Sequence, residues 1–279
     1  MDKIALEMIP FTRLIWKSER NKERWKSRLE RISRMQSLAE YETVRQGYRE
    51  AATIHLTFDN SFELLSKITE DNLYFLPIAK SAFYEGFSHL HLSVQRGKPY
   101  FIYGVLSRNR EKALRFKEAS NDPTKVHFEV GRMLGYPQCC IEAFNKRWRE
   151  GKIDPMWEAA LETLDKELPI SESMRGEGVK HTLVCRPFPE ANQLLRYFGA
   201  RITTHLPHSF SCSETLKVAE YWKETMREID SSAYRWLEKL LKMPLVWDAY
   251  RGIVQVSNAL FIGITTTGFS KDRYLIKTR

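Results

Sequence analysis

The sequence has few cysteines and no long apolar run. Only four of its 279 residues are cysteine, far below the density of small domains held together by disulfides. No stretch approaches the about eighteen consecutive apolar residues of a transmembrane helix. Residues 1–16 lack the apolar core and the small-residue cleavage site of a signal peptide. We therefore expect a cytoplasmic protein with no membrane partner, whose thiols stay reduced and available for metal, redox or catalytic chemistry.

Several motifs of nucleotide-dependent and hydrolytic enzymes are also missing. The chain contains no Walker loop, no Gly-x-Ser-x-Gly elbow, no His-Glu-x-x-His and no Gly-x-Gly-x-x-Gly. These motifs supply a phosphate cradle, an exposed nucleophile, a zinc site with its base and a dinucleotide-binding turn. Their absence argues against classical nucleotide-dependent transfer and against zinc-protease chemistry.

The charge is positive overall and concentrated near the N-terminus. The net charge is +9, and nine Lys or Arg against three Glu lie between Arg13 and Arg34. A basic helix of this kind could follow the phosphates of a nucleic acid. It could equally be a solvated face with ion pairs between residues one turn apart. The sequence leaves both interpretations open.

Hydrophobic spacing predicts an α+β fold. Residues 16–50 read as a long helix, because Trp25, Leu29 and Ile32 recur at helical spacing. Two hairpins are expected, one joining 89–94 to 100–106 and one within 252–265. Strands and helices alternate without a βαβ rhythm, which favours a helix-rich single domain with two antiparallel hairpins. Within it, we expect a basic helical N-terminal extension (1–50) and an α+β domain (51–279) that carries the functional residues.

The remaining elements follow from local patterns and from breaks at glycine and proline. We expect strands at 52–58 and 200–204, and helices at 62–68, 110–119, 126–167 with a break at 135–137, 192–197 and 213–242.

An adjacent pair of cysteines is the most distinctive feature of the chain. Cys139 and Cys140 follow Pro137, a residue that favours the first position of a helix. The pair should therefore lie in the first helical turn. Free backbone N–H groups and the positive end of the helix dipole there stabilise a thiolate, the form that attacks electrophiles and binds metals.

A second helix start carries the same chemistry. Ser211 and Glu214 have the spacing of a capping box, which places Cys212 first in the following helix. His205 and His208 lie a few residues upstream, in a loop that Pro207 interrupts. Imidazole and thiolate donors thus gather within eight residues, as they do in metal sites.

Together the two segments predict a metal site formed by Cys139, Cys140, His208 and Cys212. The cofactor would be a zinc or iron ion, because thiolate and imidazole suit both, or an iron–sulfur cluster. His205 is a further ligand or a general base, and Cys140 and Glu142 are candidate catalytic groups. Alternatively, the cysteines are small buried residues and His208 caps the helix.

Other candidate residues have weaker signals. Cys185 lies in an apolar run and is expected in the core rather than in the site. His89 and His91 share one face of a predicted strand, which more often marks a polar surface than a metal site. Three arginines near Cys185 could hold a carboxylate or phosphate, or form ordinary surface ion pairs. They are Arg186, Arg196 and Arg201.

Two motifs resemble a known family. Gly131-Arg-Met-Leu-Gly-Tyr-Pro-Gln-Cys-Cys140 is similar to the Gly-Arg-Leu-Leu-Gly-Tyr-Pro-x-Cys-Cys segment of an uncharacterised prokaryotic family, domain of unknown function 483. Tyr103-Gly104 resembles its Tyr-x-Gly strand, and the segment from His205 to Cys212 resembles its His-x-Pro-Cys-Ser-x-x-Cys motif. The likeness covers roughly residues 100–264 and implies no known reaction. His208 stands where the family pattern has cysteine, which keeps a metal donor at that position.

These observations lead to three functional hypotheses. The first is a metal- or iron–sulfur-dependent enzyme that acts on a small or nucleotide-like substrate through the cysteine and histidine site. The second is a metal-free cysteine-dependent transferase with Cys140 or Cys212 as nucleophile and His205 as base. The third is a nucleic-acid-binding protein in which the basic N-terminal helix binds phosphates and the metal is structural.

Overall fold

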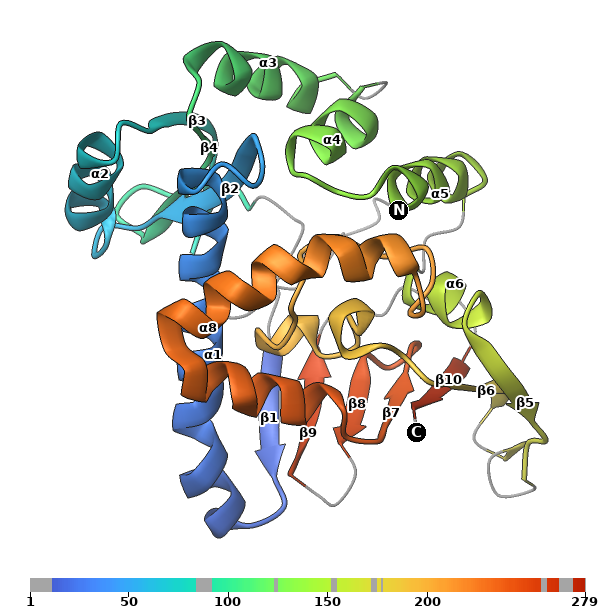
Figure 1. The fold of residues 1–279 in the computed structure, drawn as a ribbon. Helices are drawn as coiled ribbons and strands as arrows, with labels where there is room; N and C mark the ends of the chain where they lie inside the picture. The colour runs from blue at the N-terminus through green and yellow to red at the C-terminus, as the bar shows by residue number, and fades with distance from the viewer. Residues whose placement is uncertain are drawn as a thin grey trace, which may run out of the picture.

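The computed structural model describes residues 12–83, 92–122, 125–151, 155–171, 175–176, 178–256, 260–265 and 273–278. In these residues the fold is α+β, as predicted, with one large and one small β-sheet (Figure 1). None of the described helices combines the length and the apolar character needed to cross a bilayer.

The large sheet has seven strands and draws on both ends of the chain. Every neighbouring pair is antiparallel except β10 with β6, which is parallel. From one edge to the other, the strands are β1 (Thr12–Trp16), β9 (Phe261–Thr265), β8 (Ile253–Val256), β7 (Leu245–Asp248), β10 (Arg273–Thr278), β6 (Val179–Cys185) and β5 (Leu164–Leu168).

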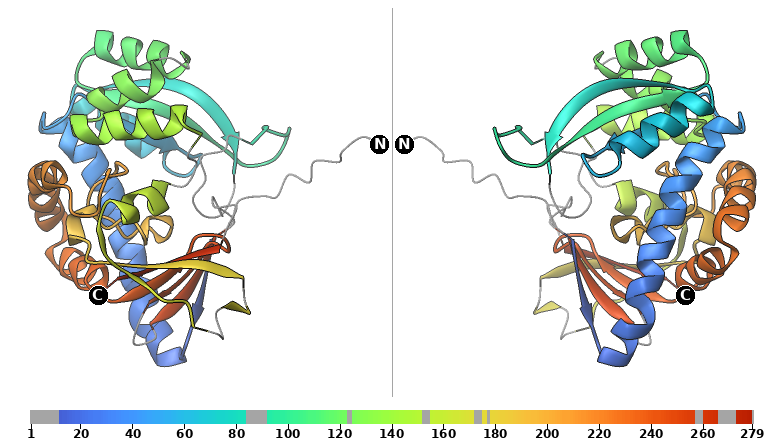
Figure 2. Two further views of the ribbon diagram at one scale, coloured as in Figure 1. Left: turned by 90° about the vertical axis from the view of Figure 1, so that its right-hand side faces the viewer. Right: turned by 90° about the vertical axis from the view of Figure 1, so that its left-hand side faces the viewer.

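Two long helices cover one face of this sheet (Figure 2). Helix α1 (Glu19–Arg45) begins at Ser18, whose hydroxyl caps the amide of Asn21, and α8 (Ser213–Leu241) bends at Asp230 into the two arms seen in Figure 1. The largest core lies between these helices and the sheet, where side chains of α1, α8 and β7 such as Ile32, Trp222 and Trp247 are almost fully buried. Residues 12–50, predicted as an extension, thus supply β1 and the central helix of the core.

The small sheet lies near the C-terminal end of α1. Its order is β2 (Ala51–Leu56), β4 (Tyr100–Ser107) and β3 (Tyr74–Ala82), all antiparallel. One face packs against α1 and against α2 (Ser61–Glu70), and the other against α3 (Arg110–Ser120) and residues just before α5.

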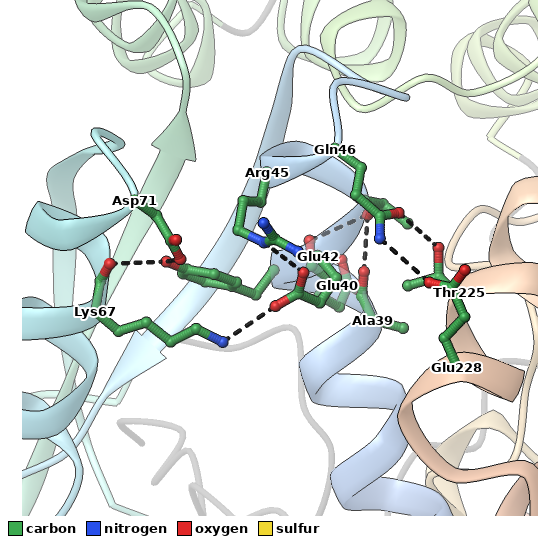
Figure 3. A network of polar contacts seen from close by, with 11 residues as sticks. Ala39, Glu40, Glu42, Arg45, Gln46, Lys67, Asp71, Thr225 and Glu228 are labelled. Atoms are coloured by element: carbon green, nitrogen blue, oxygen red, sulfur yellow. Dashed lines mark hydrogen bonds and ion pairs between the residues drawn. The ribbon is translucent and has the colours of Figure 1, made fainter.

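Polar side chains fix α1 between its neighbours (Figure 3). On one side Glu42 accepts a hydrogen bond from Lys67 of α2 at 3.1 Å. On the other, Gln46 bonds with Thr225 and Glu228 of α8. The helix therefore joins the two sheets into one structure.

Short elements lie along the chain between α3 and α8. They are the π-helix η1 (Val126–Val130), α4 (Gly131–Met133), α5 (Gln138–Arg149), α6 (Pro155–Leu161) and the 3-10 turns η2 (Pro189–Ala191) and η3 (Arg196–Phe198).

Several predicted elements are confirmed. The long N-terminal helix, the helices at 110–119 and 213–242 and the pairing of strands within 252–265 all correspond to observed elements. The turn of that last hairpin, at 257–259, lies outside the described residues.

Other predictions are wrong. Only the 3-10 turn η3 occurs at the end of the helix expected at 192–197, and the strand expected at 200–204 is irregular backbone. The end of the predicted helix 126–167 is strand β5. In the first predicted hairpin, 92–94 is not a strand, and β4 pairs with β2 and β3 instead. His89 and His91 lie outside the described residues.

Candidate metal centre

The first part of the site is the start of α5. Gly135 adopts a left-handed conformation, with φ of 74°, and ends the preceding helix. Pro137 follows as the N-cap of α5, whereas the sequence predicted it as the first helical residue. Its ψ of 137° is extended, so the helix begins at the next residue. The amide of Cys140 is already bonded to the Pro137 carbonyl. Cys139 and Cys140 thus lie in the first helical turn, as expected.

The second part is the start of α8. Here the predicted capping box is wrong, because the N-cap is Cys212 and not Ser211. The sulfur of Cys212 accepts the amide N–H of Thr215 at 3.4 Å. Ser211 instead belongs to a tight turn in which its amide and hydroxyl both bond with the Ser209 hydroxyl. Sulfur can take the capping role because it accepts hydrogen bonds, most strongly as thiolate.

The two helix starts meet and bring four donors together. The Sγ atoms of Cys139 and Cys140 are 3.9 Å apart, and each is 3.8 Å from the Sγ of Cys212. The Nδ1 of His208 lies 3.6 Å from the Sγ of Cys140. All four ligand atoms lie within 4.8 Å of one another, close enough to hold a metal ion.

Four of the six spacings among these atoms match the edges of a coordination tetrahedron, and the two between His208 and the sulfurs of Cys139 and Cys212 lie within 4.8 Å. With metal–sulfur bonds of about 2.3 Å and a metal–nitrogen bond of about 2.0 Å, sulfur atoms should be about 3.8 Å apart and a sulfur and a nitrogen about 3.5 Å apart. The residues present therefore fit a single tetrahedral ion with three sulfur ligands and one nitrogen ligand.

The protonation of the cysteines is strongly coupled. The hydrogen bond with the Cys140 thiol, the hydroxyl and amide of Thr215 and the nearby His208 hold the pKa of Cys212 far below its usual range. The same bond with Cys212, and burial, raise the pKa of Cys140, and burial raises that of Cys139. Without a metal, one thiolate at Cys212 thus accepts hydrogen bonds from its neighbours, and two helix N-termini favour that charge.

His205 lies beside the four donors rather than among them. It is buried, and its Nε2 is 2.9 Å from the Thr215 hydroxyl, which in turn lies 3.8 Å from the Sγ of Cys140. Burial lowers the pKa of His205 to about 3. The imidazole is therefore neutral at physiological pH and connects to the cysteines through Thr215.

Glu142 faces away from the site. Its side chain is exposed and accepts a hydrogen bond of 2.7 Å from the amide of Gln138. Cys185 is also apart from the cluster, in the core on β6, as predicted.

Sequence reasoning missed three residues that hold the site together. Arg147 of α5 donates a hydrogen bond of 2.8 Å to the backbone carbonyl of His208. Thr163 bonds with the Ser209 hydroxyl and with the amide of Phe210, fixing the turn before Cys212. Thr215 links Cys140, Cys212 and His205. The only feature of the sequence that could have indicated a role for Thr215 in the site is its position one turn into α8.

The cluster of four donors borders a small cavity of about 260 Å³. Cys140 and His205 lie in its wall together with the rings of Tyr136 and Phe144. Arg196 and Arg201, which we singled out from the sequence, also line it. Arg186 does not, since it is exposed and paired with Asp165.

Comparison with profiles of known protein families, with curated proteins and with solved structures finds no match for this chain. The resemblance to domain of unknown function 483 therefore stays a prediction.

Proposed function

We propose that Cys139, Cys140, His208 and Cys212 bind one metal ion, and that zinc is the ion that suits them best. The observation that carries this proposal is the agreement between four donor distances and the edges of a tetrahedron. Three thiolates and one imidazole are a common ligand set for zinc. The low pKa of Cys212 supports the proposal, because a metal ligand must be deprotonated.

A single ion fits the donors better than an iron–sulfur cluster. The cysteines of a four-iron cluster bind separate irons, so their sulfur atoms are held farther apart than ligands of one ion. The close approach of all four donors, within 4.8 Å, favours a mononuclear site. A single iron with the same ligands is the alternative to zinc.

The ion would hold together the wall of a substrate site. Four protein ligands fill a tetrahedral zinc, which is the arrangement of structural rather than catalytic zinc sites. We therefore propose that the ion fixes the starts of α5 and α8, and that a small-molecule substrate binds in the adjacent cavity, beside Cys140 and His205. On this proposal the protein is a metal-dependent enzyme, in which the neutral His205 positions Thr215 and substrate by hydrogen bonds.

Metal analysis of the purified protein tests the proposal. We expect one zinc per chain by elemental analysis, and an absorbance spectrum without the visible bands of iron–thiolate centres. Cys212→Ser and His208→Ala should each lose the metal. Cys185→Ala, the matched control, removes a thiol outside the site and should keep it. A wild-type protein without stoichiometric metal, or a Cys212→Ser variant that retains it, would overturn the proposal.

Metal-free thiol chemistry is a second candidate because the pKa of Cys212 is so low. The thiolate is the form of cysteine that reacts with iodoacetamide near neutral pH. Labelling of the chelator-treated protein separates the two proposals, since a metal site protects its cysteines only while the ion is bound.

Nucleic-acid binding through α1 is a third candidate. Arg28 and Arg31 contact the ring of Trp236 on α8, and Arg31 also pairs with Asp230, so part of the basic segment holds the fold together. Exposed basic residues remain at Lys17, Arg20, Arg24, Lys26 and Arg34. A titration of RNA and DNA at several salt concentrations tests this candidate, because phosphate contacts weaken steeply with salt.

A further inference from the structure

A larger cavity lies between α1, the small sheet and residues 201–204. Its volume is about 880 Å³, within the range of cavities that bind small organic molecules. Glu40 and Lys67, both in its lining, are seen in Figure 3 at the junction of α1 and α2. None of the four proposed metal ligands lines this cavity. Ligand binding in the cavity is therefore independent of metal binding by those four residues.

One wall of the cavity is aromatic. His55 on β2 lies against two rings of β4, with its centroid 4.9 Å from that of Phe101 and 5.4 Å from that of Tyr103. Tyr136 adds a further ring where the small sheet faces residues 201–204. Such a wall suits a planar ring, because aromatic faces and edges pack favourably with one another.

The charged residues of the lining are mostly basic. Positively charged side chains outnumber carboxylates in the wall by four to two. The basic residues are Arg34, Arg49, Lys67 and Arg201, and the acidic residues are Glu40 and Glu63. A concave, partly desolvated site with a positive excess concentrates anions.

Two buried donors in this wall have unused hydrogen-bonding capacity. The Arg49 side chain is 0% exposed, donates to Thr43 and to Glu40, and stacks on the Trp222 ring. Yet its Nη1, like the Nε2 of Gln36, has no acceptor among the described residues. Buried N–H groups rarely go without a partner, because their desolvation is costly. An oxyanion that reached these two N–H groups from the cavity would supply the missing acceptor.

This cavity adjoins the small one at the proposed metal site. Tyr136, Arg201 and Thr204 belong to the walls of both. No Asp or Glu of the described chain lines the small cavity, whereas Arg196 and Arg201 do. Positive charge therefore continues from the large cavity towards Cys140.

From these observations we infer that the large cavity binds a small organic anion with a planar aromatic ring, of about the size of a nucleoside monophosphate. The ring packs against His55, Phe101 and Tyr103, and the phosphate or carboxylate group lies at the end formed by Arg49 and Arg201. That end faces the small cavity, so the anionic group approaches the proposed metal site. Binding itself rests on the lining of the large cavity and not on the metal.

Calorimetric titration of the full chain tests the inference with defined probes. Adenosine monophosphate represents a ring with phosphate, and indole-3-acetate represents a ring with carboxylate. We expect saturable binding of one molecule per chain for at least one of them, and the preferred probe identifies the oxyanion. Adenosine and indole are the controls, because they have the ring without the charge. If phosphate is preferred, adenosine should bind at least tenfold more weakly than adenosine monophosphate. If carboxylate is preferred, indole should bind at least tenfold more weakly than indole-3-acetate.

Variants of the two walls complete the test. Arg201→Gln should weaken binding at least tenfold, and His55→Ala should weaken it about fivefold or more, as expected for loss of a stacking ring. Arg186→Gln, which removes an exposed arginine outside the cavity, should change nothing. If Arg201→Gln does not fold, the exposed Arg34→Gln replaces it, with a weaker effect of the same sign.

Three results would overturn the inference. They are no saturable binding of either anion, equal binding of the charged and uncharged members of a pair, and unchanged affinity in both wall variants. Metal content measured on the same samples keeps the two proposals apart, because a protein without metal that still binds the anion contradicts only the metal proposal.

Discussion

The Sγ atoms of Cys140 and Cys212 lie 3.8 Å apart although 72 positions separate the two residues in the chain. One sulfur lies in the first turn of α5 and the other caps α8, so the positive ends of two helix dipoles converge on the pair. The site therefore joins the start of α5, which follows the residues packed on the small sheet, to the start of the long bent helix α8.

Metal removal should destabilise the protein. The four ligands come from two separate segments, so they come together only in the folded state. A metal that binds only the folded state adds its binding free energy to the stability of the fold. We expect a chelator to lower the melting temperature of wild type and added zinc to restore it. Cys212→Ser should respond to neither, and Cys185→Ala should behave like wild type. An unchanged melting temperature after proven loss of metal would contradict this prediction.

Arg147 should tune metal affinity without being a ligand. Its hydrogen bond to the His208 carbonyl fixes the loop that presents the imidazole. Loss of such supporting contacts typically reduces metal affinity about tenfold to a hundredfold. Arg147→Gln should show this loss in a competition titration with a chromogenic chelator. Arg149→Gln, on the exposed side of the same helix, is the control and should leave the affinity unchanged.

Asp230 should stabilise the bend of α8 in a pH-dependent way. Its backbone is non-helical, and its carboxylate accepts the amide of Ala233 at 2.9 Å and pairs with Arg31 at 2.6 Å. Partial burial acts to raise the pKa of Asp230, but the Ala233 amide and Arg31 outweigh it and hold the pKa below its usual value. Asp230→Ala should cost about 1 kcal/mol of unfolding free energy at pH 7, as for other lost helix caps.

The sign of the pH dependence follows from the lowered pKa. The contribution of the charge is complete above the unfolded-state pKa of about 3.9 and is lost as pH falls through the folded-state pKa. The difference in unfolding free energy between wild type and Asp230→Asn should therefore be constant from pH 5 to about pH 7 and shrink below about pH 4. A difference that grows on acidification would show that the assignment is wrong.

Gly104 should not tolerate a side chain. A Cβ at this position would lie 2.4 Å from the Phe75 ring and 2.7 Å from the Leu76 carbonyl oxygen, which is backbone and cannot move aside easily. Gly104→Ala should lower the unfolding free energy by about 3 kcal/mol, the upper range for overpacking. Gly97→Ala, whose Cβ meets nothing within 4 Å, should cost only about 1 kcal/mol for its left-handed backbone. Equal costs in denaturant titrations would contradict the clash.

Local signals were sufficient to predict the centre of the site. Pro137 marked one helix start, and the capping-box spacing of Ser211 and Glu214 marked the other, so the sequence places the thiols of both segments at helix starts. The exact cap could not be predicted, because Cys212 competes with Ser211 for the same role. Arg147 could not be found either, since its partner is a backbone carbonyl, a group that every residue carries.

The fold shows the same division between local and long-range information. Helix α1 follows from the spacing of Trp25, Leu29 and Ile32, which face the core as predicted. The segment after β6 does not follow from spacing, because buried polar side chains replace regular backbone bonding. Gln193, for example, donates to the carbonyl of Thr203, and Asn192 accepts the amide of Leu194. The parallel pairing of β10 with β6 joins distant segments, which no local pattern specifies.

X-ray absorption at the metal edge of the purified protein tests the central claim most directly. The account predicts one zinc per chain in a first shell of three sulfur atoms at about 2.3 Å and one nitrogen at about 2.0 Å. His208→Ala should remove the nitrogen contribution or the metal itself. A shell of oxygen and nitrogen only, a metal–metal scatterer typical of a cluster, or the absence of stoichiometric metal would contradict the account.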